Sequence, residues 1–81
     1  MKEQNVVVTM LLEEKRNKVA SIIQTARVQK GWSQTGLGDR VGFSRSTIAR
    51  IEACAFSPNA DQLYMILECL DLTLKIGNEE I

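Results

Sequence analysis

The sequence predicts an all-α fold, a bundle of four to five helices followed by one short β-strand. Three observations predict it. Apolar residues recur at intervals of three and four through most of the chain, which is the spacing of helices with one buried face. Glycines and Ser, Thr or Asn residues stand where these stretches end and begin. Near the C-terminus the interval changes to two, the spacing of a strand.

The first part of the chain contains an ambiguous segment and a clear helix. Val6–Val8 favour a strand, whereas Thr9 could cap a helix that continues through Glu13 and Glu14. The next segment predicts a helix that ends at Gly31, because its apolar residues recur at three and four. The predicted inward stripe of this helix consists of Leu12, Val19, Ile22, Ile23 and Ala26.

Two short helices follow, and both have recognisable ends. Ser33 is a suitable N-cap for a helix from Gln34 to Val41, which Gly42 ends. Ser44 caps the next helix, which extends to about Ala53. The connection between the two is so short that they must cross steeply, which makes them a helix-turn-helix.

This tight connection has two steric requirements, and the sequence meets both. Gly42 can adopt the positive φ that the turn needs, and Gly38 leaves room for close contact between the two helices. Ile48 and Ile51 are spaced to point inward, so the rest of the third helix faces out. The outward positions are Arg45, Ser46, Ala49 and Arg50.

Pro58 breaks the chain before a fourth helix, which opens with a capping box formed by Asn59 and Gln62. Its inward stripe consists of Leu63, Ile66, Leu67 and Leu70. We divide the chain into an N-terminal extension of residues 1–16, a helix-turn-helix domain of residues 17–71, and a C-terminal strand and tail of residues 72–81.

The apolar residues that alternate after the fourth helix predict a half-buried strand over residues 72–76, followed by Gly77, Asn78 and a short acidic tail. The chain offers no obvious partner strand except Val6–Val8, and an unpaired apolar edge tends to pair with another chain. We therefore expect two copies to dimerise antiparallel through the strand residues Leu72, Leu74 and Ile76.

Composition excludes most kinds of catalysis. The chain has no histidine and only two cysteines, so it lacks a Ser-His or Cys-His nucleophile and a four-ligand Cys/His zinc site. It also lacks a phosphate-binding glycine motif. We therefore expect no enzyme activity, no metal and no cofactor. No apolar run reaches the roughly 18 residues of a membrane span, and the start is not a secretory signal, so we expect a cytoplasmic protein.

The net charge is zero, but basic and acidic residues are concentrated in different halves of the chain. Residues 1–50 carry nine basic and four acidic side chains, whereas residues 51–81 carry one basic and six acidic side chains. This asymmetry allows a cationic face for nucleic acid. An even mixture of charges on the folded surface is the alternative, and the zero net charge predicts modest non-specific affinity for DNA.

Many residues at fixed spacing carry the strongest functional signal. They are Arg27-Val-Gln-Lys-Gly-Trp-Ser-Gln34, Leu37-x-x-x-Val41-Gly42-Phe43-Ser44-Arg45-Ser46-Thr47-Ile48-x-Arg50-Ile51-Glu52, Pro58 and Leu63-x-x-Ile66-Leu67. Over about residues 17–71 this pattern resembles the phage lambda repressor/Cro type of helix-turn-helix, the XRE family. The tail from Leu70 to Ile76 is similar to the strand that follows the fourth helix in antitoxins of the Hip or Hig type.

The resemblance implies a lambda repressor-like bundle and assigns roles position by position. The positions that match contacts to base edges in the major groove are Arg45, Ser46, Ala49 and Arg50. The positions that match phosphate contacts are Gln34, Ser44 and Thr47. Arg27 and Glu52 match a buried structural ion pair, and we expect Trp32 in the core rather than as a stacking platform.

Two residues depart from the family pattern. Gly36 replaces a helix-favouring residue, at an expected cost of about 1 kcal/mol relative to alanine. Cys54 stands where a glycine normally ends the recognition helix, so the C-cap at this helix is unusual.

The function that these observations imply is sequence-specific binding of double-stranded DNA by a homodimeric transcriptional repressor. Two-fold symmetry predicts a palindromic operator with half-sites about 34 Å apart. Within this class we favour an antitoxin that represses its own operon and binds a toxin protein, over a phage-type repressor or a restriction controller. The alternative is a protein-binding adaptor or antitoxin module that uses the helix-turn-helix only as a scaffold.

Overall fold

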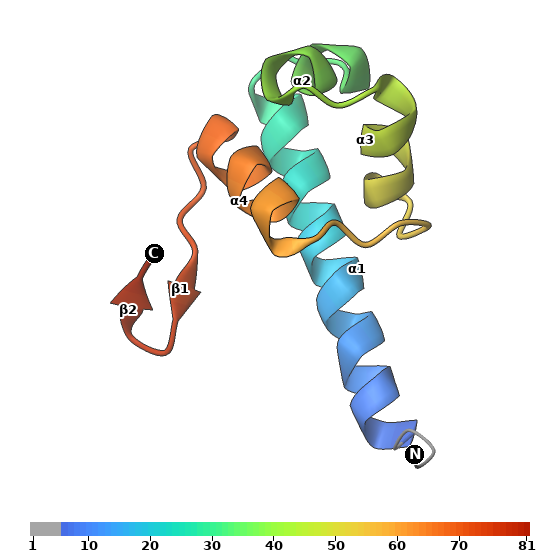
Figure 1. The fold of residues 1–81 in the computed structure, drawn as a ribbon, viewed down its shortest axis with the longest axis vertical. Coiled ribbons are helices and arrows are strands. Elements are labelled where there is room, and N and C mark those ends of the chain that lie inside the picture. The colour runs from blue at the N-terminus through green and yellow to red at the C-terminus, as the bar shows by residue number, and fades with distance from the viewer. Residues whose placement is uncertain (1–5) are drawn as a thin grey trace.

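The computed structural model describes residues 6–81 and confirms the all-α prediction (Figure 1). The described chain forms four helices and then a two-stranded antiparallel sheet of very short strands. The elements are α1 (Val6–Gln29), α2 (Gln34–Val41), α3 (Arg45–Glu52), α4 (Ala60–Cys69), β1 (Lys75–Ile76) and β2 (Glu79–Glu80).

Helix α1 is a single helix of 24 residues, so the strand considered for Val6–Val8 is wrong. The helical penalty of a β-branched residue is below about 1 kcal/mol, and β1 and β2 pair with each other rather than with this segment. The C-terminal half of α1 packs against the other helices, whereas its N-terminal half projects away from them (Figure 1). Ile22, predicted to point inward, is 46% exposed because its neighbour Ile23 takes the core-facing position.

The predicted helix starts are confirmed at three N-caps. The Ser33 and Ser44 hydroxyl oxygens each accept a hydrogen bond from the backbone N–H three residues later, at 2.9 and 3.1 Å. Asn59 and Gln62 form the predicted capping box, with each side chain accepting from the backbone N–H of the other at 2.8 and 2.9 Å. These bonds satisfy helix N–H groups that have no partner within the helix.

Each of the four helices is followed by a residue with a left-handed backbone, which is a glycine after two helices and another residue after the other two. Gly31 and Gly42 have φ of 76° and 82°, as predicted for the ends of α1 and α2. After α3 and α4 the same backbone position is occupied by Cys54 and Asp71, with φ of 60° and 58°. The chain therefore keeps the backbone geometry of a glycine cap at Cys54 without the glycine.

One hydrophobic core joins the four helices. Each helix contributes one fully buried side chain, and these are Ile23, Leu37, Ile48 and Ile66. Trp32, Phe43, Phe56 and Leu63 are partly buried and pack around the core. Because residues from α2 and α3 lie at its centre, the core fixes the position of the helix-turn-helix relative to α1 and α4.

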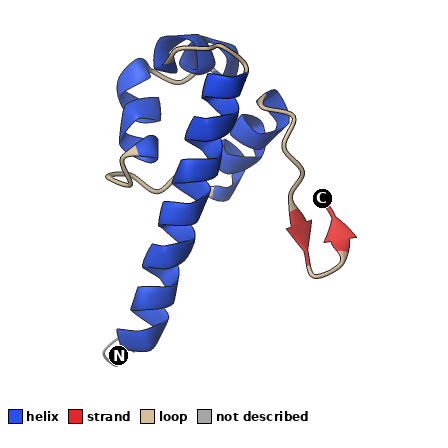
Figure 2. Ribbon diagram, turned by 180° about the vertical axis from the view of Figure 1, so that it is seen from behind, coloured by secondary structure: helices blue, strands red, loops and turns tan. Residues whose placement is uncertain are grey.

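The C-terminal strand differs from its prediction in length and in partner. Within the predicted segment only Lys75–Ile76 is a strand. It pairs with Glu79–Glu80 of the same chain in an antiparallel hairpin that extends away from the helices (Figure 2). Gly77 permits this turn with a φ of 63°. The acidic residues after the turn lack the apolar alternation of a strand, so the sequence predicts a tail there instead.

The three predicted dimerisation residues lie in different surroundings. Leu72 is partly buried and packs against the core, and Leu74 is also partly buried. Ile76 is 64% exposed on the hairpin.

Candidate nucleic-acid interface

The two helices of the helix-turn-helix approach each other very closely. A Cβ atom built on Gly38 in α2 would lie 2.5 Å from the backbone oxygen of Phe43 in the turn and 3.5 Å from the Ile48 side chain. Any residue with a Cβ would therefore push the turn away from α2. The turn also contains Gly42, whose left-handed conformation reverses the chain within a few residues. Glycine at these two positions sets the angle at which α3 leaves the turn.

Helix α3 has one face in the core and one face toward solvent. Ile48 and Ile51 are buried, as the sequence predicted. The predicted base-contact residues lie on the remaining surface: Arg45, Ser46 and Arg50 are exposed, and Ala49 is partly buried. Two guanidinium groups, a hydroxyl and a methyl group therefore lie on one accessible helix surface. This set of groups can donate hydrogen bonds to guanine and contact the thymine methyl group.

The N-terminus of α3 carries two of the three predicted phosphate-contact residues. Ser44 is exposed and Thr47 is partly buried. The Ser44 Oγ accepts a hydrogen bond from the Thr47 backbone N–H at 3.1 Å, and the two hydroxyl groups are 3.0 Å apart in a second hydrogen bond. Both hydroxyl groups thus lie at the positive end of the helix dipole, where an anion is favoured.

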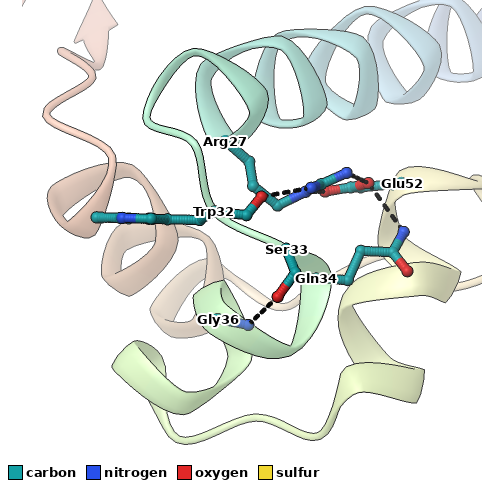
Figure 3. Close-up of polar contacts among 6 residues, drawn as sticks. All are labelled: Arg27, Trp32, Ser33, Gln34, Gly36 and Glu52. Carbon is teal, nitrogen blue, oxygen red and sulfur yellow. Dashed lines mark hydrogen bonds and ion pairs between the residues drawn. The ribbon is translucent and has the colours of Figure 1, made fainter.

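The third predicted phosphate-contact residue, Gln34, makes an interaction that the sequence did not predict. Its Nε2 donates a hydrogen bond to Glu52 Oε1 at 3.1 Å, and its side chain is partly buried (Figure 3). The amide therefore connects the start of α2 to the end of α3. The sequence gives no signal for this contact, because it joins residues 18 positions apart on two helices.

Arg27 and Glu52 form an ion pair between α1 and α3. Arg27 Nε and Nη2 lie 2.7 and 3.0 Å from the two carboxylate oxygens, and the side chains are only 10% and 3% exposed. Arg27 Nη1 also donates to the Trp32 carbonyl oxygen at 2.7 Å (Figure 3). The hydrogen bond to Glu52 raises the pKa of Arg27 above its ordinary value, so the guanidinium stays charged. This network fixes α3 against α1 and the turn before α2.

Three contacts between cations and aromatic rings lie near this site, and the sequence did not predict them. The Arg40 guanidinium stacks 3.9 Å from the centre of the Trp32 ring, and Lys30 Nζ lies 5.4 Å from the same centre. The Arg50 guanidinium lies 5.6 Å from the centre of the Phe56 ring. All three distances are within the range of cation–π attraction. Trp32 therefore packs against the core, as expected, and also contacts two cations.

The described residues contain neither a metal site nor a membrane-spanning helix. Within residues 6–81 no group of three or more Cys, Asp or Glu side chains is placed to hold a metal ion. No helix in this part of the chain is both long enough and apolar enough to cross a membrane.

Comparison with known proteins gives one family and one related structure. The model of the helix-turn-helix family matches residues 23–76. No curated protein matches the sequence significantly. A solved complex of a Ser-to-Ala variant of HipB with an O2 20mer is similar in fold, with a TM-score of 0.67 and 21% sequence identity over 94% of this chain and 92% of the other. The family match covers most of the chain and includes both helices of the helix-turn-helix, α2 and α3. The protein therefore belongs to the XRE type of DNA-binding helix-turn-helix proteins.

Proposed function

We propose that the protein is a homodimeric transcriptional repressor that binds a palindromic operator sequence-specifically in the cytoplasm. The observation that carries the proposal is the outward surface of α3, with Arg45, Ser46 and Arg50 exposed and Ala49 beside them. Buried contacts on the opposite side of the helix hold this surface in place, through Ile48, Ile51 and the pairing of Glu52 with α1. A rigid helix with free polar groups suits direct readout in the major groove.

Each group on this surface has a chemical role in the proposal. Arg45 and Arg50 each donate two hydrogen bonds to guanine O6 and N7, and Ser46 bonds to a neighbouring base edge. Ala49 contacts a thymine methyl group. Ser44 and Thr47 bind a phosphate at the N-terminus of α3, which sets the register of the helix on the duplex. Gln34 can contact a phosphate of the DNA backbone in one of two ways. Its amide either breaks the hydrogen bond to Glu52 or donates its second N–H to the phosphate.

The protein also acts, in this proposal, as an antitoxin that represses its own operon and binds a toxin. Two observations support it: the similarity of the fold to HipB and the short strand that follows α4. A toxin partner provides a way to regulate repression.

A protein-binding adaptor is the second candidate, and one observation favours it. The net charge of the chain is zero, whereas binding to phosphates draws its affinity from an excess of basic groups. In an adaptor the outward surface of α3 contacts a protein. The two candidates differ in how they respond to salt, because only DNA binding releases condensed counterions.

The experiment is selection of a binding site from a random duplex library, followed by gel-shift titration at several salt concentrations. We expect a two-fold symmetric site and an affinity that falls steeply as salt rises. Arg45→Ala and Arg50→Ala should each cost about 1–3 kcal/mol at particular base pairs. Lys75→Ala is the control, because it removes an exposed cation from the hairpin, away from α3.

Other results contradict parts of the proposal. An equal loss on every sequence for both arginine variants would make them phosphate contacts rather than base contacts. The absence of a retarded complex at any salt concentration would favour the adaptor.

A further inference from the structure

A groove lies where α1 passes the connection from α3 to α4 (Figure 1). Its volume is about 430 Å³, within the roughly 300–1,000 Å³ that is typical of sites for small molecules. Most of its lining is apolar and comes from α1, α3, the connection and α4: Val19, Ala20, Ile51, Phe56, Pro58 and Leu63. The groove therefore offers an apolar floor to an occupant of small-molecule size.

The charged residues that line the groove are both basic. They are Lys15 and Arg16, which precede the apolar residues that α1 contributes by one helical turn. Both side chains are exposed, and neither forms an ion pair within residues 6–81. Lys15 has no carboxylate three or four positions away on the helix, and one of these neighbours is Lys18. Cations at one end of an apolar floor favour an occupant that carries a negative charge.

Hydrogen bonds fix the walls of the groove relative to each other. The Cys54 thiol donates from the connection to Asn17 Oδ1 of α1 at 3.1 Å. The backbone N–H groups of Ala55 and Phe56 both donate to the Arg50 carbonyl oxygen, at 2.8 and 3.2 Å. The connection is thus tied to α1 and to the last turn of α3. The groove is therefore formed before any ligand binds, as is usual for small-molecule sites.

We propose that this groove binds a small organic anion with an apolar tail, of the medium-chain carboxylate class. The tail lies on the apolar floor, where it is removed from water, and the carboxylate accepts hydrogen bonds from Lys15 and Arg16. A simple anion would leave the floor uncovered, and an uncharged apolar molecule would leave the two cations without a partner. A ligand that has both parts matches the whole groove.

An occupant of the groove also influences the outward surface of α3, through Phe56. The Phe56 ring lines the groove and lies 5.6 Å from the Arg50 guanidinium. A tail that packs against this ring changes its position, and with it the position of the Arg50 side chain. The ligand is then an effector of operator binding. This consequence rests on the proposed function, in which Arg50 contacts a base.

The test is titration of the full chain with octanoate, in the absence of DNA, by isothermal titration calorimetry. We expect saturable binding of octanoate. Octanol has a tail of the same length without the charge, and acetate has the charge without the tail. Each of these two probes should bind at least about tenfold more weakly than octanoate, because it makes only one of the two kinds of contact.

Charge variants on one helix separate the groove from the general charge of the protein. Lys15→Glu should weaken octanoate binding by about five- to tenfold, because it places a like charge beside the carboxylate. Lys18→Glu is the matched control. Lys18 is also exposed but does not line the groove, so its change should stay within about twofold in physiological salt. Circular dichroism verifies that both variants keep the helical content of the wild type.

The influence on Arg50 is measured without DNA, by NMR of its side chain. Octanoate should shift the Nε–H resonance of Arg50, which Arg50→Ala identifies by its loss. The shift should be much smaller in Phe56→Leu, which lacks the aromatic face that the guanidinium contacts.

Four results would overturn the inference. They are the absence of saturable octanoate binding, equal binding of octanoate and octanol or acetate, equal losses for Lys15→Glu and Lys18→Glu, and an Arg50 resonance that octanoate does not shift. Equal binding of acetate would mark a site for simple anions, such as a phosphate of the duplex. The outcome is separate from that of the proposed function. A chain that binds octanoate but retards no duplex contradicts DNA binding alone, and a chain that binds its operator but no octanoate contradicts this inference alone.

Discussion

Gly38 lies so close to Phe43 that a Cβ atom on the glycine would be 2.5 Å from the backbone oxygen of the phenylalanine. A backbone oxygen in a short turn cannot move without moving α3, so alanine at this position must push the two helices apart. We expect Gly38→Ala to lower the free energy of unfolding by about 1–3 kcal/mol, measured by urea denaturation.

Gly36, in the same helix, provides the matched control. The nearest atom to a Cβ on Gly36 would be the Ser33 Oγ at 3.3 Å. The exposed Ser33 side chain can shift by the few tenths of an ångström that this contact requires. Gly36→Ala should therefore raise stability by about 0.5–1 kcal/mol, through its helix propensity. Similar destabilisation by both variants would argue against close approach at Gly38 as the cause.

The buried ion pair predicts a second, larger effect. Glu52→Gln preserves the size of the side chain but leaves Arg27 charged and without a carboxylate in a site that is 10% exposed. We expect a loss of about 3–5 kcal/mol, because the cost is that of an uncompensated buried charge. A thermal melt or a urea titration measures it.

The exposed ion pair of the same chain is the control for this measurement. Lys30 Nζ and Asp71 Oδ2 are 2.7 Å apart, but the Asp71 side chain is 79% exposed. Asp71→Asn removes the charge and keeps a residue that tolerates the left-handed backbone, so it should cost about 0–1 kcal/mol. Equal losses for Glu52→Gln and Asp71→Asn would mean that the Arg27 site is effectively solvated.

Local chemistry explains why so much of the fold was predictable. Ser33, Ser44 and Asn59 cap helices through contacts within three residues, so the sequence contains the whole interaction. The outward position of Arg45 and Arg50 follows from the inward position of Ile48 and Ile51 by helical periodicity alone.

The predictions from sequence were wrong where contacts between residues distant in the sequence decide the local structure. Val6–Val8 prefer a strand locally, but β1 and β2 pair with each other, and the helix of residues 6–29 continues through this segment. The sequence predicted a strand for Leu72, yet this residue packs against the core, and the strand pairs with two glutamates that carry no apolar alternation. The Gln34 contact with Glu52 likewise depends on how two helices cross, which periodicity does not specify.

The left-handed backbone of Cys54 predicts that glycine at this position gives a more stable protein than alanine. It has a φ of 60°, where a residue with a Cβ costs about 1–2 kcal/mol, and its Sγ donates to Asn17 Oδ1 at 3.1 Å. Cys54→Ala and Cys54→Gly both remove the thiol, but only the glycine variant relieves the backbone. We therefore expect Cys54→Gly to unfold at a higher urea concentration than Cys54→Ala, by about 1 kcal/mol in free energy. An alanine variant as stable as the glycine variant would show that the left-handed conformation costs little here.

Phe56 predicts an effect on DNA binding through Arg50. Its ring packs against the core and lies 5.6 Å from the Arg50 guanidinium, so it restricts an otherwise exposed side chain. Phe56→Leu keeps the apolar packing but loses the aromatic face, which should lower operator affinity by about two- to fivefold, the equivalent of about 0.5–1 kcal/mol. Fluorescence anisotropy with the selected operator measures this change. In the Arg50→Ala background Phe56→Leu should have no further effect, because the side chain that it orients is absent. Independent, additive losses would mean that Phe56 acts on the fold of the connection after α3 rather than on Arg50.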